Sequence, residues 1–463
     1  MFTYQDFTAA SNKTEFVFDA IGEHKASIPY TIAVSADLYD RQRNKTINEY
    51  VRTMFTLAGA KVEDFTASNS KIASNFFHRL NTQRCTYSLG NGVSFANDDS
   101  GKLKEKLGEK FDNRLFEAAY DALIHGLSFG FWNIDELHVF PLTEFVPLWD
   151  EYDGQLKAGI RFWQIGKNKP LIAVLYELDG YTKYECESGG DPKEVESKRA
   201  YKVRVASNGA GDVAIIGEEN YSALPVVPLW GSRLHQSTLV GMQQAIDSFD
   251  LIRSGFANDL TDCAEIYWLI ENAGGMTDAD LARFRDRLKI NHIVEADTGD
   301  GAKVTPYTQD IPYAARQAYL NDIRAGIYED FGGLDVHEIS ADSTNDHLEA
   351  AYQPLDENAD DFEYQLIQFI QQLLFVAGFE MDTPVFKRNR ISNYREQTDM
   401  VLAAANYLDE ETVLNKLPWI TVDEVQKILE KRDEEDSERM ASFIRNQQTE
   451  EEQAEQTEQE VEE

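Results

Sequence analysis

The alternation of apolar and polar residues is most regular between residues 238 and 331, where it predicts two long helices. The second helix begins at Pro312, whose missing N–H costs nothing in a first turn, and ends at Phe331 before two glycines. At 1.5 Å per residue the first helix, over 238–262, has a length of roughly 37 Å. Its apolar residues recur at helical spacing along one face: Leu239, Met242, Ile246, Phe249, Phe256 and Leu260.

A short segment with strand-forming composition separates these two helices. Its β-branched and aromatic residues predict strands over 264–271 and 302–307 and a shorter strand over 291–295. Thr277 opens a helix that runs through Lys289. The sequence therefore predicts a small α/β lobe at the end of a two-helix stalk, which is a shape suited to contact with another molecule.

The first 237 residues are predicted to combine helices with a β-rich region. Residues 1–35 show no clear pattern, whereas apolar periodicity predicts helices over 46–57, 70–80 and 114–126, with strands over 86–95 and 128–134. Residues 224–231 are interpreted as a stiff, proline-containing connector into the first long helix. Further strand signals predict an antiparallel sheet: 160–165, 171–178, 181–185, 201–206 and 213–216.

The chain beyond the second long helix is predicted to pass from loop to helix. Residues 336–350 are polar and without periodicity, so we expect a loop. The last fifteen residues, 449–463, hold eight glutamates and no basic residue, which predicts disorder. Between them we expect a helix over 362–374, a strand over 383–386 and helices over 395–408 and 422–445. The fold class that follows is α+β.

Composition narrows the classes of function. The 463 residues include 81 acidic and 44 basic ones, a formal net charge of −37. This charge argues against a protein that grips nucleic acid by neutralising phosphates, but not against one past which DNA slides. Cys85, Cys186 and Cys263 lie far apart, which indicates neither a disulfide framework nor a thiolate zinc site. No secretory segment follows Met1 and no run of 18 apolar residues occurs, so we expect a reducing compartment and no membrane span.

Motifs of catalysis and cofactor binding are weak. The P-loop pattern is absent, and the histidines lack metal-binding spacing. Gly209–Ala214 matches a dinucleotide-binding turn, but the short strand-like sequence after it favours a hairpin. Asp356, Asn358 and Asp360 have the spacing of a calcium loop without its glycine and bidentate glutamate. Lys387–Arg390 is interpreted as a salt-bridged structural patch, with phosphate binding as the alternative. We therefore expect no enzymatic activity, no cofactor and no metal.

Short segments between Tyr39 and Arg432 carry a likeness through their order along the chain. They are 69–76, 90–93, 125–130, 145–150, 224–228, 245–250 with Ser254 and Asn258, 386–389, 410–414, 417–418 and 422–425. This succession, with the two-helix stalk and its lobe in the middle, resembles the portal proteins of tailed bacteriophages, of the type found in siphophages of Gram-positive hosts.

The resemblance implies a dodecameric ring at one vertex of the phage head that serves as the channel for DNA packaging and ejection. Family tunnel loops often approach the following helix through a small-residue, Ser-Gly-containing sequence, and this chain departs from that pattern at 345–350. The implied division is an N-terminal arm (1–35), a wing (36–237), stem helices (238–262 and 309–335), a clip (263–308), a tunnel loop (336–350), a connecting helix (351–385), crown helices (386–446) and an acidic tail (447–463).

The same resemblance implies candidate site residues and partners. Those facing the DNA channel are Ser340, Asp342, Ser343, Thr344, Asn345, Asp346 and His347. Those docking partners at the clip are Tyr267, Trp268, Arg283, Arg287 and Lys303. The implied partners are further copies of the chain, terminase, scaffold and major capsid proteins, a head–tail adaptor and double-stranded DNA. The implied location is the virion, with the host cytoplasm during assembly, and a separate terminase ATPase accords with the missing P-loop.

Two alternatives stand beside this interpretation. One is another ring component of the phage head–tail junction, although such chains are usually much shorter. The other is a cytosolic α+β enzyme with an unrecognised site. A ring-shaped oligomer favours the portal, whereas a monomer with a deep pocket of pKa-shifted groups favours the enzyme.

Overall fold

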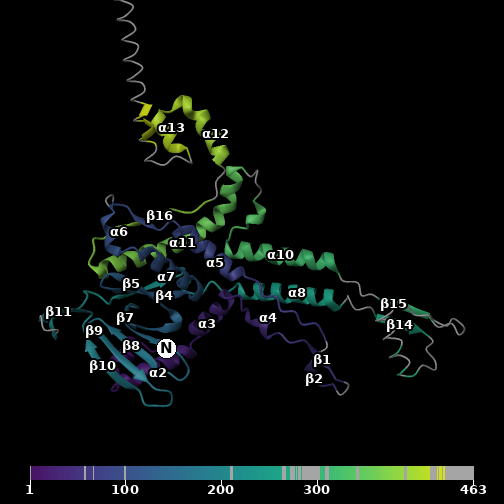
Figure 1. The fold of residues 1–463 in the computed structure, drawn as a ribbon, viewed down its shortest axis with the longest axis horizontal. Coiled ribbons are helices and arrows are strands. Elements are labelled where there is room, and N and C mark those ends of the chain that lie inside the picture. The colour runs from purple at the N-terminus through teal and green to yellow at the C-terminus, as the bar shows by residue number, and fades with distance from the viewer. Residues whose placement is uncertain are drawn as a thin grey trace, which may run out of the picture. The chain divides into compact units, whose positions relative to one another are not determined.

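The computed structural model describes residues 2–56, 59–65, 67–98, 101–208, 212–262, 267–271, 303–307, 312–339, 344–390 and 394–417, with isolated positions up to residue 432. These residues combine helices with mostly antiparallel strands (Figure 1), in agreement with the predicted mixed fold class. They form two compact units. The first comprises Met1–Leu334 and Pro354–Asn389, and the second comprises Asp335–Gln353 and Arg390–Glu463.

An antiparallel five-stranded sheet forms one core of the first unit. Its strands follow the order β10-β9-β8-β7-β6: β6 (Phe145–Trp149), β7 (Leu156–Trp163), β8 (Leu171–Glu177), β9 (Gly180–Cys186) and β10 (Lys193–Arg199). Every second residue of a strand points to the same face, so Leu148, Ile160 and Leu175 share one apolar face. Helices α1 (Tyr4–Ala9) and α2 (Lys13–Ala26) pack on this face through Phe7 and Phe16. Three strands of the antiparallel sheet predicted from the sequence are confirmed as β7, β8 and β9, whereas the strands predicted over 201–206 and 213–216 pair in a separate two-stranded sheet.

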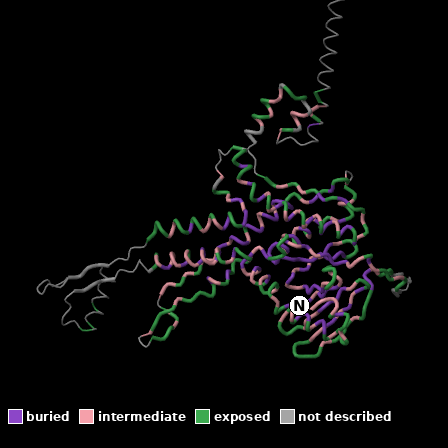
Figure 2. The backbone as a smooth tube through the Cα atoms, turned by 180° about the vertical axis from the view of Figure 1, so that it is seen from behind, coloured by how far each residue is buried: buried purple, intermediate pink, exposed green. Residues whose placement is uncertain are grey.

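A second core surrounds a three-stranded sheet in the same unit. β4 (Leu127–Asn133) lies between β13 (Val226–Trp230) and β5 (Glu136–Pro141), and six of its seven residues are buried. Helices α7 (Phe111–His125) and α11 (Asn345–Ala377) contribute Leu115 and Phe369 to this core. A Cβ at Gly130 would lie 2.5 Å from the Phe369 ring, so the close approach of α11 to β4 requires a glycine. Figure 2 shows buried residues concentrated in this part of the unit.

Shorter elements connect these cores to one another. Helix α3 (Ile28–Asp40) packs on α7 and α5 (Phe76–Leu89), and α4 (Lys45–Glu49) follows it. Strands β3 (Val93–Phe95) and β16 (Pro384–Phe386) pair antiparallel beside α6 (Lys102–Leu107). Two hairpins complete the set: β1–β2 (Thr53–Phe55 with Lys61–Glu63) and β11–β12 (Lys202–Asn208 with Asp212–Glu219). Asn208 lies opposite Asp212, which confirms a hairpin around Gly209–Ala214, although 209–211 lie outside the described residues.

Two long helices, α8 (Gln243–Asp262) and α10 (Tyr313–Phe331), lie side by side (Figure 1). They lead to strands β14 (Tyr267–Glu271) and β15 (Lys303–Tyr307), which pair antiparallel. The predicted stalk and two of its predicted strands are therefore confirmed, while most of 272–302 lies outside the described residues. Gly332 takes a left-handed conformation (φ 63°) that ends α10, as the Gly-Gly pair predicted.

The second unit is helical in its described residues. It contains the 3-10 turns η3 (Val336–Glu338) and η4 (Ala405–Tyr407), and the helices α12 (Tyr394–Ala404) and α13 (Glu410–Lys416). The first turns of α11 also belong to it. The helix predicted over 395–408 is confirmed. The helix predicted over 422–445 and the acidic tail lie almost entirely outside the described residues.

Several predicted elements are wrong. The helix predicted over 46–57 ends at Glu49, and the one predicted from residue 70 begins only at Phe76 and continues to Leu89, across much of a predicted strand. The connector over 224–231 contains strand β13, and its Pro228 is tolerated because β13 is an edge strand. The loop predicted over 336–350 ends at Thr344, because α11 runs unbroken from Asn345 and includes the helix predicted over 362–374.

Other elements had no counterpart in the prediction. Residues 1–35 form α1, α2 and part of α3, so the boundary drawn at residue 36 falls inside a helix. Strand β10 was missed because most of its residues are exposed and charged, which removes the alternation that marks a half-buried strand.

Candidate functional site

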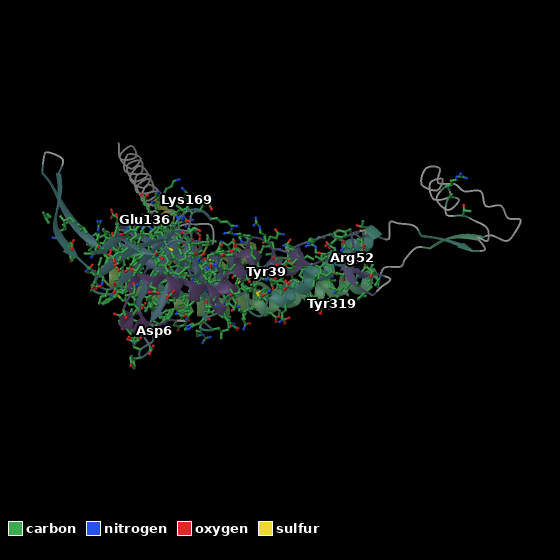
Figure 3. The ribbon with its side chains drawn as sticks, turned by 90° about the horizontal axis from the view of Figure 1, so that it is seen from below. Asp6, Tyr39, Arg52, Glu136, Lys169 and Tyr319 are labelled. Carbon is green, nitrogen blue, oxygen red and sulfur yellow. The ribbon has the colours of Figure 1, made fainter. Side chains whose placement is uncertain are left out.

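The helix pair α8–α10 is held by an apolar seam at its base. Ile246 and Phe249 of α8 pack with Ile327 and Tyr328 of α10 in one buried cluster. The Phe76 ring of α5 meets the rings of Phe249 and Tyr328 with centroids 5.0 and 6.1 Å away, both edge-on. Tyr39 and Tyr319, labelled in Figure 3, lie along this pair. Because aromatic side chains from three helices interlock here, the pair is rigidly anchored in the first unit.

Farther along the pair, polar contacts add to the apolar seam. Arg316 of α10 forms an ion pair with Asp259 of α8 and lies over the Phe256 ring at 5.9 Å. The rings of Phe256 and Tyr313 are 5.6 Å apart. These contacts join the two helices close to the ends from which β14 and β15 continue.

A row of polar side chains on α8 binds an extended segment of the chain. Asp250, Ser254 and Asn258 are buried and occur at every fourth position. Their side-chain oxygens accept from the backbone N–H groups of Ser74, Ile72 and Ser70, at 2.8, 3.0 and 2.6 Å. We call this arrangement the α8 ladder.

The α8 ladder works because two regular repeats nearly coincide. Four residues of an α-helix rise about 6 Å, and two residues of an extended chain span about 6.6 Å. Every second N–H of residues 70–74 therefore meets every fourth side chain of α8. The ladder ties the N-terminal part of the chain to the long helix.

Acidic side chains of α8 extend this attachment toward α3 and α4. Asp247 accepts from the Tyr39 hydroxyl at 2.5 Å and from the Thr46 hydroxyl at 2.7 Å. Asp250 also accepts from the amide of Asn44. Burial raises the pKa of Asp250, and these hydrogen bonds oppose that rise. Burial and the bond to Asp247 raise the pKa of Tyr39 to about 12. The carboxylates of α8 thus act as structural acceptors.

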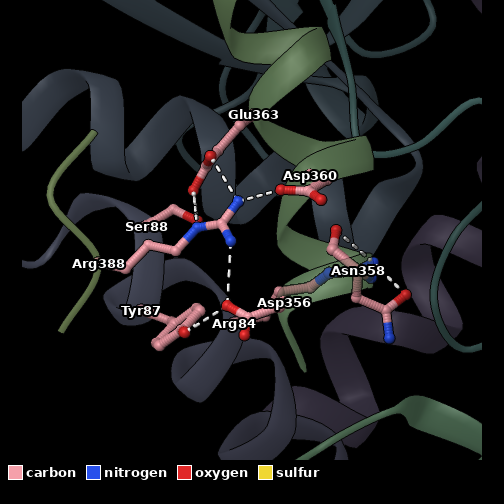
Figure 4. Close-up of polar contacts among 8 residues, drawn as sticks. All are labelled: Arg84, Tyr87, Ser88, Asp356, Asn358, Asp360, Glu363 and Arg388. Atoms are coloured by element: carbon pink, nitrogen blue, oxygen red, sulfur yellow. Dashed lines mark hydrogen bonds and ion pairs between the residues drawn. The ribbon is translucent and has the colours of Figure 1, made fainter. Parts of the chain in front are cut away.

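A second polar cluster, shown in Figure 4, lies where α5, α11 and the segment after β16 meet. Arg388 donates to both carboxylate oxygens of Glu363, at 3.0 and 2.9 Å, to Asp356 at 3.0 Å, and to Asp360. The hydroxyls of Tyr87 and Ser88 donate to Asp356 and Glu363 at 2.6 and 2.8 Å. We call this the Arg388 cluster.

The Arg388 cluster tests two interpretations of the sequence, one of the basic patch and one of the acidic residues on α11. It confirms that the basic patch is structural as far as Arg388 is concerned, because that guanidinium is bound to three carboxylates. It also shows that Asp356 and Asp360 lie inside α11 and pair with an arginine, so they do not form a helix-starting turn, although Asp360 is solvent-exposed. The hydrogen bonds to the carboxylates raise the pKa of Arg388.

The end of α10 is fastened beside this cluster. The Asn358 amide of α11 donates to the Phe331 carbonyl at 3.0 Å, and its oxygen accepts from Arg84 of α5 at 2.7 Å. Burial lowers the pKa of Arg84 to about 10. Gln83 and Leu334 exchange two hydrogen bonds of 2.9 and 3.0 Å. The residues that follow α10 therefore leave from a well-anchored point.

Titratable groups also cluster between α3 and α7. His125 lies 2.9 Å from Asp37, and His78 of α5 lies 3.0 Å from Asp40, which also accepts from the Tyr120 hydroxyl. Burial raises the pKa of the neighbouring Asp121 from 3.8 to about 7, while His125 lowers it. Shifted carboxyls often mark active sites, but the neighbouring His125–Asp37, His78–Asp40 and Tyr120–Asp40 contacts join α3 to α7 and α5. We interpret them as helix-linking contacts.

The predicted channel residues fall at the start of α11 or outside the described residues. Ser340, Asp342 and Ser343 lie outside them. Thr344 is exposed and its hydroxyl accepts from the His347 backbone N–H at 3.4 Å, as a helix cap does. Asn345, Asp346 and His347 form the first turn of α11. The loop predicted over 336–350 is therefore helical from Asn345 onward.

The predicted docking residues are partly brought together. Tyr267, Trp268 and Lys303 belong to the β14–β15 hairpin, where Tyr267 lies opposite Tyr307 and Lys303 opposite Glu271. Arg283 is helical and exposed, and Arg287 lies outside the described residues. The α8 ladder was missed, although its polar residues at four-residue spacing beside the apolar stripe are visible in the sequence.

The described residues contain no group of three or more His, Cys, Asp or Glu side chains that could hold a metal ion. In the same part of the chain, no helix is long and apolar enough to cross a membrane.

Comparison with known proteins identifies related sequences. The sequence profile described as "Phage portal protein, SPP1 Gp6-like" matches residues 32–438. The chain is 24% identical over 392 residues to the portal protein of Clostridium phage phiCD119, covering 78% of this chain and 84% of that protein. It is 22% identical over 409 residues to the portal protein of Bacillus phage SPP1, covering 80% and 77%. A chain from the neck of an empty GTA particle, computed with C6 symmetry, matches with a TM-score of 0.43 and 13% identity over 73% of this chain and 88% of that one.

Proposed function

The chain belongs to the family of SPP1 Gp6-like phage portal proteins, and from this premise we propose that twelve copies form a ring in which the α8–α10 pairs are the stem around the channel. A phage portal protein is a component of the virion and provides the ring-shaped channel through which DNA is packaged and ejected at one capsid vertex. Membership of this family implies a structural, non-enzymatic role.

The observation that carries the assignment of the stem is the anchoring of the helix pair. A channel wall must keep its shape while DNA passes and while a motor acts on it. Aromatic packing with α5 at the base, the Arg316–Asp259 ion pair farther along and the α8 ladder restrain α8 over most of its length. Such a helix transmits force between its ends instead of bending.

The negative net charge of the chain is consistent with passage of DNA through the ring. Each phosphate that a protein neutralises releases counterions and adds affinity, which acts as friction in a channel. A net charge of −37 keeps that affinity low. The polymer can then slide in either direction, into the head during packaging and out of it during ejection.

We assign docking to the β14–β15 hairpin, the described part of the predicted clip. A two-stranded hairpin has two outer strand edges, which can pair with strands of a neighbouring copy, of terminase or later of a head–tail adaptor. Residues 335–344 and the first turn of α11 take the role of the tunnel loop that meets DNA, with Thr344, Asp346 and His347 exposed there. The proposed crown is formed by α12, α13 and the residues after them.

Assembly partners follow from the same role. The ring assembles with scaffold and major capsid proteins in the host cytoplasm before it becomes part of the virion. A separate terminase ATPase supplies the energy for packaging, in keeping with the absence of a P-loop sequence.

Electron microscopy and native mass spectrometry of the purified protein, alone and coexpressed with its scaffold and capsid proteins, test this proposal. We expect a ring of twelve copies with a central hole. Persistence of the monomer in the presence of those partners would refute the proposal, and a ring with a different number of copies would refute the dodecamer alone.

A further inference from the structure

The β1–β2 hairpin and the residues that flank it carry an unusual concentration of exposed apolar side chains. Phe55 and Phe65 are 75% and 85% exposed, and Tyr50, Val51 and Met54 are between 40% and 44% exposed. Figure 2 shows this hairpin as an exposed projection beside the helix pair. Apolar patches on such a projection mark interaction sites in soluble proteins.

The hairpin is well formed but uncovered. Its strands pair Thr53 with Glu63 and Phe55 with Lys61, and the Asp64 N–H donates to the Arg52 carbonyl at 2.9 Å. All three residues of β1 are exposed, although successive side chains of a strand point to opposite faces. Neither face of β1 is therefore packed against the rest of the chain. A hairpin of two strands is marginally stable in water without a covering surface.

An open cleft of about 400 Å³ lies at the base of the same hairpin. It is lined by residues of α8, by Arg316 of α10, and by Ile47, Tyr50 and Arg52. Gly255 of α8 opens the cleft, because a Cβ at this position would meet nothing within 4 Å. Phe55 of the same chain does not line the cleft, so the projecting ring and the cavity are separate features of one molecule.

The cleft and the hairpin carry opposite charges. The cleft is lined by two arginines, Arg52 and Arg316, and one aspartate, Asp259, a local charge of +1 in a chain of −37. The second strand of the hairpin, Lys61–Glu63, is followed by Asp64, so its end carries a net charge of −1 from Lys61, Glu63 and Asp64. Most surfaces of two acidic copies repel one another, whereas this apolar hairpin with an acidic edge matches a mildly basic apolar cleft.

We propose that the β1–β2 hairpin of each copy inserts Phe55 into the cleft beside Gly255 of the adjacent copy and links the subunits of the ring. The two patches are different surfaces of one chain, as head-to-tail contact requires, and such contacts form a ring when the rotation between copies closes. This inference rests on the proposed ring assembly. It adds which residues hold neighbouring copies together.

Cysteine cross-linking tests the contact. In a background with Cys186 and Cys263 replaced by serine, we compare Phe55→Cys, Gly255→Cys and the double variant after mild oxidation, with ring formation followed by native mass spectrometry. We expect a series of disulfide-linked oligomers from the double variant. A mixture of the two single variants should give linked dimers, and each single variant alone should give monomers.

The outcomes separate this inference from the proposed function. If the double variant forms rings but no cross-linked oligomers, the proposed docking is overturned while the proposed portal ring stands. Failure of all variants and of the unmodified chain to form rings, with partners present, would overturn both. Capture of the hairpin by a scaffold or capsid protein instead of a second copy would also overturn the docking.

A cavity-filling variant gives an independent readout. Gly255→Leu fills the cleft, and we expect it to preserve the melting temperature of the monomer, because the position is open and leucine favours a helix. Ring formation should fall by about tenfold or more. Gly326→Leu on α10 is the matched control, since its Cβ also meets nothing within 4 Å and it does not line the cleft. Normal ring formation by Gly255→Leu would contradict the docking.

Discussion

Replacement of Arg388 by alanine tests how the first unit is held together. The change removes the cation that Asp356, Asp360 and Glu363 share (Figure 4). Asp360 is 63% exposed, so it loses little. The side chains of Asp356 and Glu363 are 21% and 14% exposed, and they keep the Tyr87 and Ser88 hydroxyls as donors but lose the Arg388 guanidinium.

The expected loss in free energy of unfolding lies between the values for buried and exposed ion pairs. Breaking a buried ion pair by removing one partner costs about 3–5 kcal/mol, whereas an exposed pair contributes about 0–1 kcal/mol. Because Asp356 and Glu363 are mostly but not fully buried, we expect Arg388→Ala to lower the free energy of unfolding by about 2–3 kcal/mol. The chain segment after β16 should detach from α11 first.

Urea denaturation followed by tryptophan fluorescence measures this loss. Lys387→Ala is the matched control, because Lys387 is exposed and both variants change the net charge from −37 to −38. We expect less than about 0.5 kcal/mol for the control. Adding Glu363→Gln to Arg388→Ala should restore part of the stability, since it removes an uncompensated buried charge. Equal effects of Arg388→Ala and Lys387→Ala, or no restoration by Glu363→Gln, would refute the reasoning.

Other perturbations address the α8 ladder, the acidic cluster and the tunnel loop. Ser254→Ala should lower the free energy of unfolding in urea by about 1 kcal/mol, because it removes one acceptor of the α8 ladder. Asp250→Ala should lower it by about 2–4 kcal/mol, because it leaves the buried Ser74 N–H without an acceptor and removes one of the two acceptors of the Asn44 amide. Equal losses from the two variants would contradict this reasoning. The pKa of Asp121 is raised from 3.8 to about 7, so the neutral form favours folding and that stability is lost as the pH rises from about 4 through about 7. Asp121→Asn should therefore raise the melting temperature at pH 8 by roughly 2–6 °C and leave it unchanged at pH 4, and a rise of the same size at both pH values would count against this cause. Deletion of 340–343 should leave ring assembly intact and reduce packaged DNA in a packaging assay; normal packaging by this variant would remove the loop from the mechanism.

The sequence predicted the elements whose packing follows a simple period. The stripe from Leu239 to Phe256 buries one face of its helix, and strands β7, β8 and β9 are rich in buried apolar residues, so both patterns are visible without knowledge of the partner. The element around Thr86–Leu89 was missed for the opposite reason. Thr86 and Tyr87 favour a strand locally. The hydroxyls of Tyr87 and Ser88 nevertheless reach carboxylates of α11 from a helix, and local propensity contains no information on such distant partners.

The candidate site was less predictable than the fold. Resemblance to a family indicated Asp250, Ser254 and Asn258 as part of a characteristic segment, but their role depends on an extended partner nearly 200 residues away. The polar start of α11 lacks an apolar period because its first turns are largely exposed, so it was interpreted as loop. Contacts with DNA, with terminase and between copies remain predictions for this chain.

The small mismatch between the two repeats of the α8 ladder limits its length. Helix and extended chain drift apart by about 0.6 Å per rung, so three rungs stay within hydrogen-bonding distance, while each further rung would be stretched more. The chain must therefore leave the helix near Ser70 and Asn258, just where the β1–β2 hairpin has its base. The difference between the axial rise of a helix and that of an extended chain therefore sets the place at which the hairpin projects.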